Sequence, residues 1–169
     1  MRKEFKFKKG RLAFGVLFFS TMLIASIYFL IVPEKFIRNV FMTTEHIQIL
    51  GILGILNFST LLYSFLVILP RKYAIIISDD FLIDNSRYES LGKIKWTDIS
   101  KIEIVKKTNI EISLKVDLYS IEKRNLLKRF LTFMNNWNNK KRILISSALT
   151  DSSIDALFEE ITNAYRTNK

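Results

Sequence analysis

The chain has 169 residues, no cysteine and a formal net charge of +10. Because cysteine is absent and His46 is the single histidine, the composition excludes disulfides, thiolate nucleophiles and clustered metal sites, and we expect no cofactor and no metal. The basic excess suits either nucleic acid or an anionic lipid surface, but no helix-turn-helix, zinc or RNP-like pattern accompanies it, so we expect no nucleic-acid partner.

Two apolar stretches, residues 12–32 and 47–69, contain no charged side chain. A helix needs roughly 20 predominantly apolar residues to cross about 30 Å of hydrocarbon, and both stretches reach that length. The first stretch is too long for the apolar core of a signal peptide, and it runs into Pro33 instead of a small-residue cleavage site. The sequence therefore predicts a two-helix transmembrane hairpin over residues 12–69, with the lipid bilayer as a partner.

The charges beside these stretches predict an orientation. Residues 1–11 carry six basic side chains against one acidic one, and Arg71 and Lys72 follow the second stretch directly, whereas the connector 33–46 is balanced in charge. Basic residues near the ends of spans stay on the cytoplasmic side. We therefore expect residues 1–11 to be a basic cytosolic tail, both termini to be cytoplasmic and the connector to lie outside.

The second apolar stretch contains small and polar residues that suit contact between helices. Gly51 and Gly54 allow close approach, and the side chains of Gln48 and Asn57 can hydrogen-bond across helices. No Asp, Glu, Lys or Arg lies inside either stretch, so the usual mark of an ion or proton path is missing. We therefore interpret these residues as packing contacts and not as a transport site.

Residues 71–169 show the patterns of a small antiparallel β fold that ends in a helix. The apolar runs 73–77 and 81–84 flank a turn at Ser78-Asp79-Asp80, which predicts a hairpin. From residue 110 to 116 apolar and polar residues alternate, as in a strand with one wet face. The predicted fold class is α+β, a small antiparallel β-barrel or sandwich. The other expected elements are strands at 93–96, 101–104 and 141–146 and an amphipathic C-terminal helix from Ser152 that caps the sheet.

The stretch YAIIISDDFLIDN at 73–85, followed by GKIKWTDI at 92–99, resembles the opening of bacterial pleckstrin-homology-like (PH-like) domains. The whole layout is similar to a family of small bacterial membrane proteins of unknown function with two N-terminal transmembrane helices. This resemblance implies a PH-like fold for residues 71–169 and an address in the bacterial inner (plasma) membrane, and it implies no activity. Within the motif we expect Trp96 and Ile99 to fill the core.

The segment 121–137, which is rich in basic and large apolar side chains, is the predicted functional site. A helix with basic residues on one face and Leu, Phe and Trp on the other is suited to lie in the headgroup plane of a membrane. An ordinary helix packed on the domain with a solvated charged edge explains the pattern equally well. The residues expected at a membrane-surface or partner-binding face are Lys123, Arg124, Lys128, Arg129, Phe130, Phe133, Trp137, Lys141 and Arg142.

No motif in the chain points to catalysis. Asp79 and Asp80 are neighbours in a turn and do not define the convergent pocket that a general acid/base pair needs, so we expect no enzyme. The leading expectation is a non-enzymatic, membrane-anchored binding or scaffold protein whose cytosolic domain engages a protein partner or the inner-leaflet surface. The alternative is an immunity protein that neutralises a toxin acting at the inner membrane. The sequence leaves the partner and any homo-oligomer open.

Overall fold

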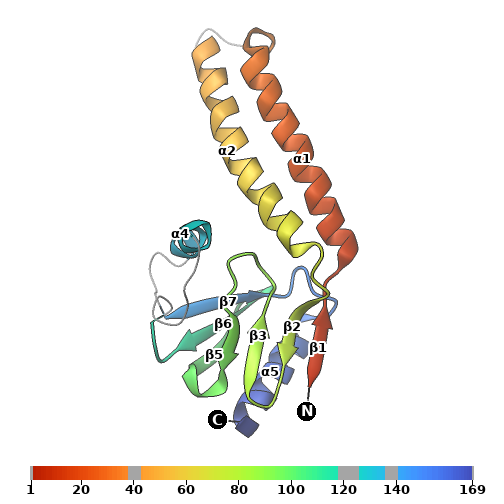
Figure 1. The fold of residues 1–169 in the computed structure, drawn as a ribbon, viewed down its shortest axis with the longest axis vertical. Helices are drawn as coiled ribbons and strands as arrows, with labels where there is room; N and C mark the ends of the chain where they lie inside the picture. Colours follow the sequence, from red (N-terminus) through yellow and green to blue (C-terminus); the bar gives the residue numbers. More distant parts are fainter. Residues whose placement is uncertain (1, 38–42, 118–125, 136–140, 169) are drawn as a thin grey trace. The chain divides into compact units, whose positions relative to one another are not determined.

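The computed structural model describes residues 2–37, 43–117, 126–135 and 141–168 (Figure 1). The chain divides into two compact units. One unit is Gly10–Leu69, and the other combines Met1–Lys9 with Pro70–Lys169. The first unit is helical and the second is α+β, so the first few residues belong with the part of the chain that follows the helices.

Two long helices, α1 (Lys9–Ile31) and α2 (Thr44–Ile68), form the first unit, with a short 3-10 helix, η1 (Pro33–Phe36), after α1. They contain 23 and 25 residues and are long and apolar enough to cross a membrane. Only 6% and 11% of their most apolar 18-residue segments are buried, whereas the core helix of a soluble protein is mostly buried. Each helix begins three residues before the apolar stretch that predicts it, because flanking polar residues add a turn.

The first turn of α2 is closed by a capping box. The hydroxyl of Thr43 accepts a hydrogen bond from the backbone N–H of His46, and the Thr43 N–H donates to His46 Nδ1 at 3.3 Å. These bonds satisfy backbone groups that a helix end leaves without partners. The single histidine of the chain is therefore a capping residue.

The helices of the hairpin pack through glycine, as the small residues in α2 predict. A Cβ atom added at Gly51 would lie 2.9 Å from the carbonyl oxygen of Ser26, and one added at Gly54 would lie 2.9 Å from Ser26 Cβ. Further along the pair, the ring of Phe19 lies 5.1 Å from that of Phe65 and 6.5 Å from that of Phe58. The two glycines therefore let α1 and α2 approach closely at Ser26, and Gly15 of α1 leaves room for the ring of Phe65.

The second unit contains a four-stranded antiparallel sheet in the order β1-β2-β3-β4. Its strands are β1 (Lys3–Lys6), β2 (Tyr73–Ile77), β3 (Phe81–Asp84) and β4 (Gly92–Lys95). Strand β1 precedes α1 and pairs with β2, which follows α2, with Glu4 opposite Ile76. The sequence predicts only a basic tail here, and this strand is the main element that it misses.

A separate three-stranded antiparallel sheet contains β5 (Ile99–Lys106), β6 (Asn109–Leu114) and β7 (Arg142–Ser146). The predicted α+β class is confirmed, but the described residues do not form a closed barrel. The 3-10 turn η2 (Trp96–Asp98) separates β4 from β5. Directly after β1, Phe7 forms an isolated antiparallel bridge with Thr150, and the described residues add no further strand at this edge of the first sheet.

The C-terminal helix α5 (Ile154–Asn168) covers the sheets and buries Leu157 and Ile161 (Figure 1). It contacts β5, β6 and η2. Trp96 and Ile99 are fully buried, as expected, and the indole N–H of Trp96 donates to the carbonyl of Ser78 at 2.9 Å. The motif residues therefore build the core at the point where the chain passes from the first sheet to the second.

A side chain at Gly54 should loosen the hairpin. We expect Gly54→Val to lower the free energy of unfolding by about 1–3 kcal/mol, because the added methyl groups collide with Ser26. The measurement is thermal unfolding of the full-length protein in detergent. Gly10→Ala is the control, since nothing lies within 4 Å of its added Cβ. Equal stability of Gly54→Val and the natural protein would contradict this packing. A second check uses Gly54→Ala, whose added Cβ meets the Ser26 side chain, and Ser26→Gly in the same protein should restore its stability.

Candidate functional site

Helix α4 (Leu126–Asn135) lies in the connection between β6 and β7, within the segment that the sequence singles out. At about 100° per residue, Lys128, Arg129, Thr132 and Asn135 occupy one arc of the helix, and the apolar residues occupy the rest. Of the other predicted positions, Lys123, Arg124 and Trp137 lie outside the described residues, and so do the side chains of Phe130 and Phe133. Lys141 and Arg142 lie after α4.

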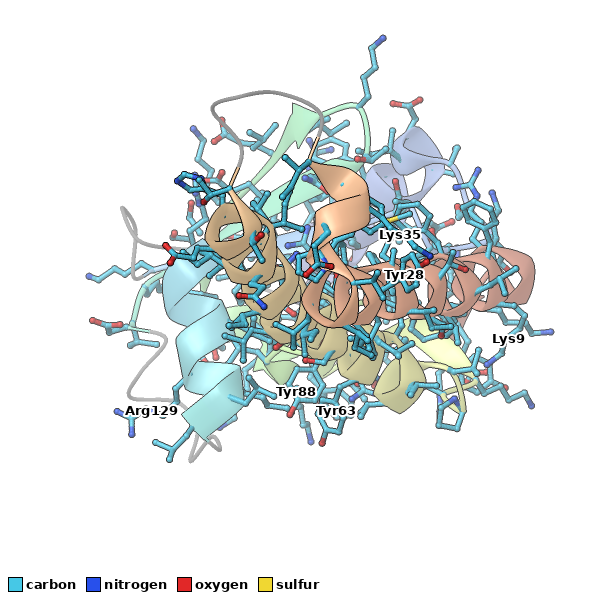
Figure 2. The ribbon with its side chains drawn as sticks, turned by 90° about the horizontal axis from the view of Figure 1, so that it is seen from above. Lys9, Tyr28, Lys35, Tyr63, Tyr88 and Arg129 are labelled. Carbon is cyan, nitrogen blue, oxygen red and sulfur yellow. The ribbon has the colours of Figure 1, made fainter. Side chains whose placement is uncertain are left out.

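The exposed groups of α4 include one large apolar side chain and one cation. Leu126 is 84% exposed on the apolar arc. Arg129 is exposed on the polar arc, and its side chain extends away from the ribbon (Figure 2). Together they give the helix a charged edge beside an apolar surface, which is the chemistry of an element that meets a headgroup layer or an amphipathic partner.

Lys128 has a different environment from Arg129. Its ammonium nitrogen lies 5.7 Å from the centre of the Tyr88 ring, and Tyr88 is buried with 4% exposure. A cation over an aromatic face contributes on the order of 0.5–1 kcal/mol at a partly exposed site. Lys128 therefore helps to hold α4 on the loop that follows β3, and Arg129 is the described cation of α4 that extends outward.

The loop that presents Tyr88 is organised around a buried carboxyl group. Asp84, at the end of β3, is almost fully buried, and its Oδ1 accepts a hydrogen bond from the Ser86 N–H at 2.9 Å. Burial raises the pKa of the Asp84 carboxyl, and hydrogen bonds from Ser86 and Ser90 oppose that rise. Arg71 Nη1 also donates to the carbonyl of Asn85 at 3.2 Å. The support of α4 is thus a loop with its own polar network.

The two predicted residues near the start of β7, Lys141 and Arg142, lie outside α4. Arg142 Nη1 bonds Glu111 Oε2 on β6 at 3.3 Å, and both side chains are partly buried. This contact joins neighbouring strands and stabilises the second sheet. Lys141 is exposed immediately before β7. The structure therefore brings Lys128 and Arg129 together on one helix and assigns Arg142 to a cross-strand pair.

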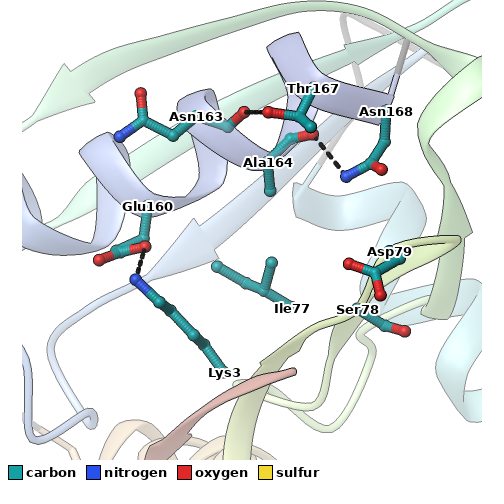
Figure 3. A pocket seen from close by; sticks show the side chains of 9 residues that line it. All are labelled: Lys3, Ile77, Ser78, Asp79, Glu160, Asn163, Ala164, Thr167 and Asn168. Atoms are coloured by element: carbon teal, nitrogen blue, oxygen red, sulfur yellow. Dashed lines mark hydrogen bonds and ion pairs between the residues drawn. The ribbon is translucent and has the colours of Figure 1, made fainter. Parts of the chain in front are cut away.

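A cavity of about 280 Å³ lies between the first sheet and α5 (Figure 3). Lys3 of β1 and Glu160 of α5 line it and form an ion pair of 2.5 Å. Thr167 and Asn168 bond backbone carbonyls of α5. The cavity therefore has the character of a polar seam that fastens β1 to α5, and the sequence alone does not reveal it because β1 is not predicted. Among the residues that the structure describes, no three His, Cys, Asp or Glu side chains gather to hold a metal ion.

Comparisons of the chain with protein-family models, with curated proteins and with solved structures give no match. The resemblance to bacterial PH-like membrane proteins thus rests on sequence motifs and stays a prediction. The structure supports a coarser description, which is a pair of apolar helices joined to an α+β unit of small antiparallel sheets.

Asp84 should make stability depend on pH. An unfolded aspartate has a pKa of about 3.9. Between that value and the raised folded pKa, the folded protein keeps a proton that the unfolded chain releases, so the free energy of unfolding falls as pH rises through this window. Asp84→Asn is neutral at every pH and keeps an oxygen acceptor for Ser86. We expect it to melt at a higher temperature than the natural protein at pH 7.5.

Thermal unfolding of the full-length protein between pH 4 and pH 8 checks this expectation. Asp80→Asn is the matched control, because Asp80 is exposed in the β2–β3 turn. A lower melting temperature of Asp84→Asn at neutral pH, with an unchanged pH profile, would show that an ionised carboxylate is needed for the loop.

Proposed function

We propose that this chain is a non-enzymatic, membrane-anchored binding protein, in which α1 and α2 cross the plasma membrane and the α+β unit works at the cytoplasmic surface. The proposal takes α4 as the contact element and the anionic inner leaflet as its first target. No feature of the described residues points to a toxin, so the alternative of an immunity protein stays a prediction without structural support.

The observation that carries the proposal is the pairing of strands on either side of the two helices. β1 ends at Lys6, before α1, and β2 begins at Tyr73, after α2, yet the two strands are neighbours in one sheet. Lys9 Nζ also donates to the carbonyl of Arg71 at 2.7 Å. Strands of one sheet cannot lie on opposite sides of a bilayer. The pairing therefore supports a hairpin that crosses twice and returns to the side from which it started.

The charges support the cytoplasmic side as the place of this sheet. Lys8, Lys9 and Arg11 surround the start of α1, and Arg71 and Lys72 follow the end of α2. Lys and Arg beside spans favour the cytoplasmic side, where anionic lipids attract each such charge by about 1 kcal/mol. The strand pairing and the charge distribution are independent observations, and both favour the same topology.

Contact between α4 and lipid would be weak in isolation. The described helix has ten residues, and one of its cations, Lys128, lies over Tyr88. Anchoring by two membrane helices changes this balance, because a tether converts a weak bimolecular contact into an intramolecular one with a high effective concentration. A short amphipathic helix is therefore sufficient to orient a domain that is already held at the surface.

An environment-sensitive fluorophore at position 126 tests the contact. The chain has no cysteine, so Leu126→Cys gives one labelling site in the full-length protein. We expect blue-shifted, stronger emission in nanodiscs of anionic lipid than in nanodiscs of neutral lipid, and a loss of most of this difference in 0.5 M salt because surface charges are screened. Arg129→Glu should reduce the difference, and Lys107→Glu, an exposed charge in the β5–β6 turn, should not.

Equal spectra in the two lipids would remove the bilayer surface as the target of α4. A shift that responds equally to Arg129→Glu and Lys107→Glu would show general charge attraction without a specific role for the helix.

A further inference from the structure

We propose that Asn57 of α2 marks a contact with a second copy of this chain inside the membrane. This inference rests on the proposed crossing of the bilayer by α1 and α2, and it adds the surface and the occupant. The contact surface, called the Asn57 stripe below, consists of Leu50, Leu53, Asn57, Thr60 and Ser64.

Asn57 lies at the depth where an unpaired amide is most unfavourable. Helix α2 runs from Thr44 to Ile68, so Asn57 is one residue past its middle. With a rise of 1.5 Å per residue and a hydrocarbon layer of about 30 Å, this position is close to the bilayer centre. No water is present there to accept or donate hydrogen bonds, and the amide has two N–H donors and a carbonyl acceptor to satisfy.

The hairpin itself leaves this amide without a partner. Asn57 is exposed, and the described residues include no hydrogen bond to its side chain. Phe58, which packs against Phe19 of α1, is the next residue and therefore lies about 100° further around the helix. The prediction that Asn57 bonds across the hairpin is wrong, because Asn57 lies about 60° from Gly54 and 120° from Gly51 around α2, at the edge of the face that packs on α1, and its side chain is exposed.

Several hydroxyl groups of the same helices are satisfied within their own helix. Ser26 Oγ donates to the carbonyl of Met22 at 2.8 Å, and Ser64 Oγ donates to that of Thr60 at 2.9 Å. Such bonds to a carbonyl one turn earlier are characteristic of Ser and Thr. Gln48, the other amide of α2, lies four residues from the helix start, where headgroup water is close. Asn57 is therefore the polar group of α2 for which a second helix is the natural partner.

The neighbours of Asn57 form a surface for such a helix. Their spacing alternates between three and four residues, which is the spacing of a coiled-coil seam. Leu50 is 51% exposed and Leu53 is 57% exposed, so the outer part of the stripe offers apolar side chains for packing. Thr60 and Ser64 are small and allow two backbones to approach. One Asn among the seam positions specifies the register and the number of helices that associate.

A second copy is the occupant that the chemistry of the amide favours. A two-fold contact places the same residue on both sides of the axis. Two Asn57 side chains then exchange hydrogen bonds, since each amide carries a donor and an acceptor. Lipid tails offer neither group, and the Asn57 stripe contains no charge that would call for a charged partner.

The test measures association of the full-length protein in liposomes by energy transfer between donor- and acceptor-labelled copies over a series of protein-to-lipid ratios. We expect a dimer whose dissociation constant rises about three- to twenty-fold in Asn57→Leu, which is the range for one interhelical hydrogen bond in a membrane. Asn57→Gln should restore part of the association. Gln48→Leu, which removes the other amide of α2, should leave it unchanged.

Disulfide crosslinking gives an independent check of the surface. Leu53→Cys should form a disulfide dimer on oxidation, and Ile52→Cys should not. The two positions are 57% and 48% exposed, but they differ by about 100° around the helix. Stronger crosslinking at position 52 would overturn the Asn57 stripe as the contact.

The remaining outcomes separate this inference from the proposed function. A protein that resists extraction by alkaline carbonate but stays monomeric at every ratio would overturn only the second-copy contact, as would a dimer that Asn57→Leu does not weaken. A monomeric protein that retains another membrane protein in an Asn57-dependent way would assign the stripe to a different partner and overturn the second copy. Release by alkaline carbonate would instead contradict the membrane crossing itself.

Discussion

The pairing of β1 with β2 is the constraint on which the other features of this protein depend. β1 has four residues, two of them lysines, and its partner β2 follows α1 and α2 in the sequence. A strand this short is not stable alone. It is held by the register with β2, by the burial of Phe7 and by the ion pair between Lys3 and Glu160 of α5. The sheet is therefore complete only when residues from both ends of the helical hairpin are present, and its closing contact is distant in sequence.

The helical hairpin has two kinds of surface, and polar groups distinguish them. One face of α2 is closed against α1 at Gly51 and Gly54, where an added Cβ atom would collide with Ser26. The hydroxyls of Thr21, Ser26, Thr60 and Ser64 bond the backbone of their own helix. Asn57 is different because its amide is exposed at mid-helix. Anchoring and association can therefore be carried by different faces of the same helix.

Much of the architecture follows from patterns visible in the sequence, because those patterns report on local burial. Long uncharged runs identify α1 and α2, and alternation identifies β6. Strand β1 is not predicted, because its four residues, three of them charged, show no alternation of apolar and polar side chains long enough to recognise. The closed barrel is not found among the described residues, because η2 separates β4 from β5 and the strands form two sheets, which the alternation pattern of single strands does not report. In the candidate site, the amphipathic pattern locates α4, but the contacts of Lys128 with Tyr88 and of Arg142 with Glu111 arise only from tertiary structure.

Crosslinking across the hairpin tests the central claim most directly. Glu4→Cys combined with Ile76→Cys places two thiols at directly opposed positions of β1 and β2 in a chain that has no other cysteine. After oxidation of isolated membranes and proteolysis in the connector between α1 and α2, we expect the two fragments to remain joined until a reductant is added. The control pair, Glu4→Cys with Asp80→Cys, should separate. Separation of the opposed pair under the same conditions would contradict the shared sheet and, with it, the return of both helices to one side of the membrane.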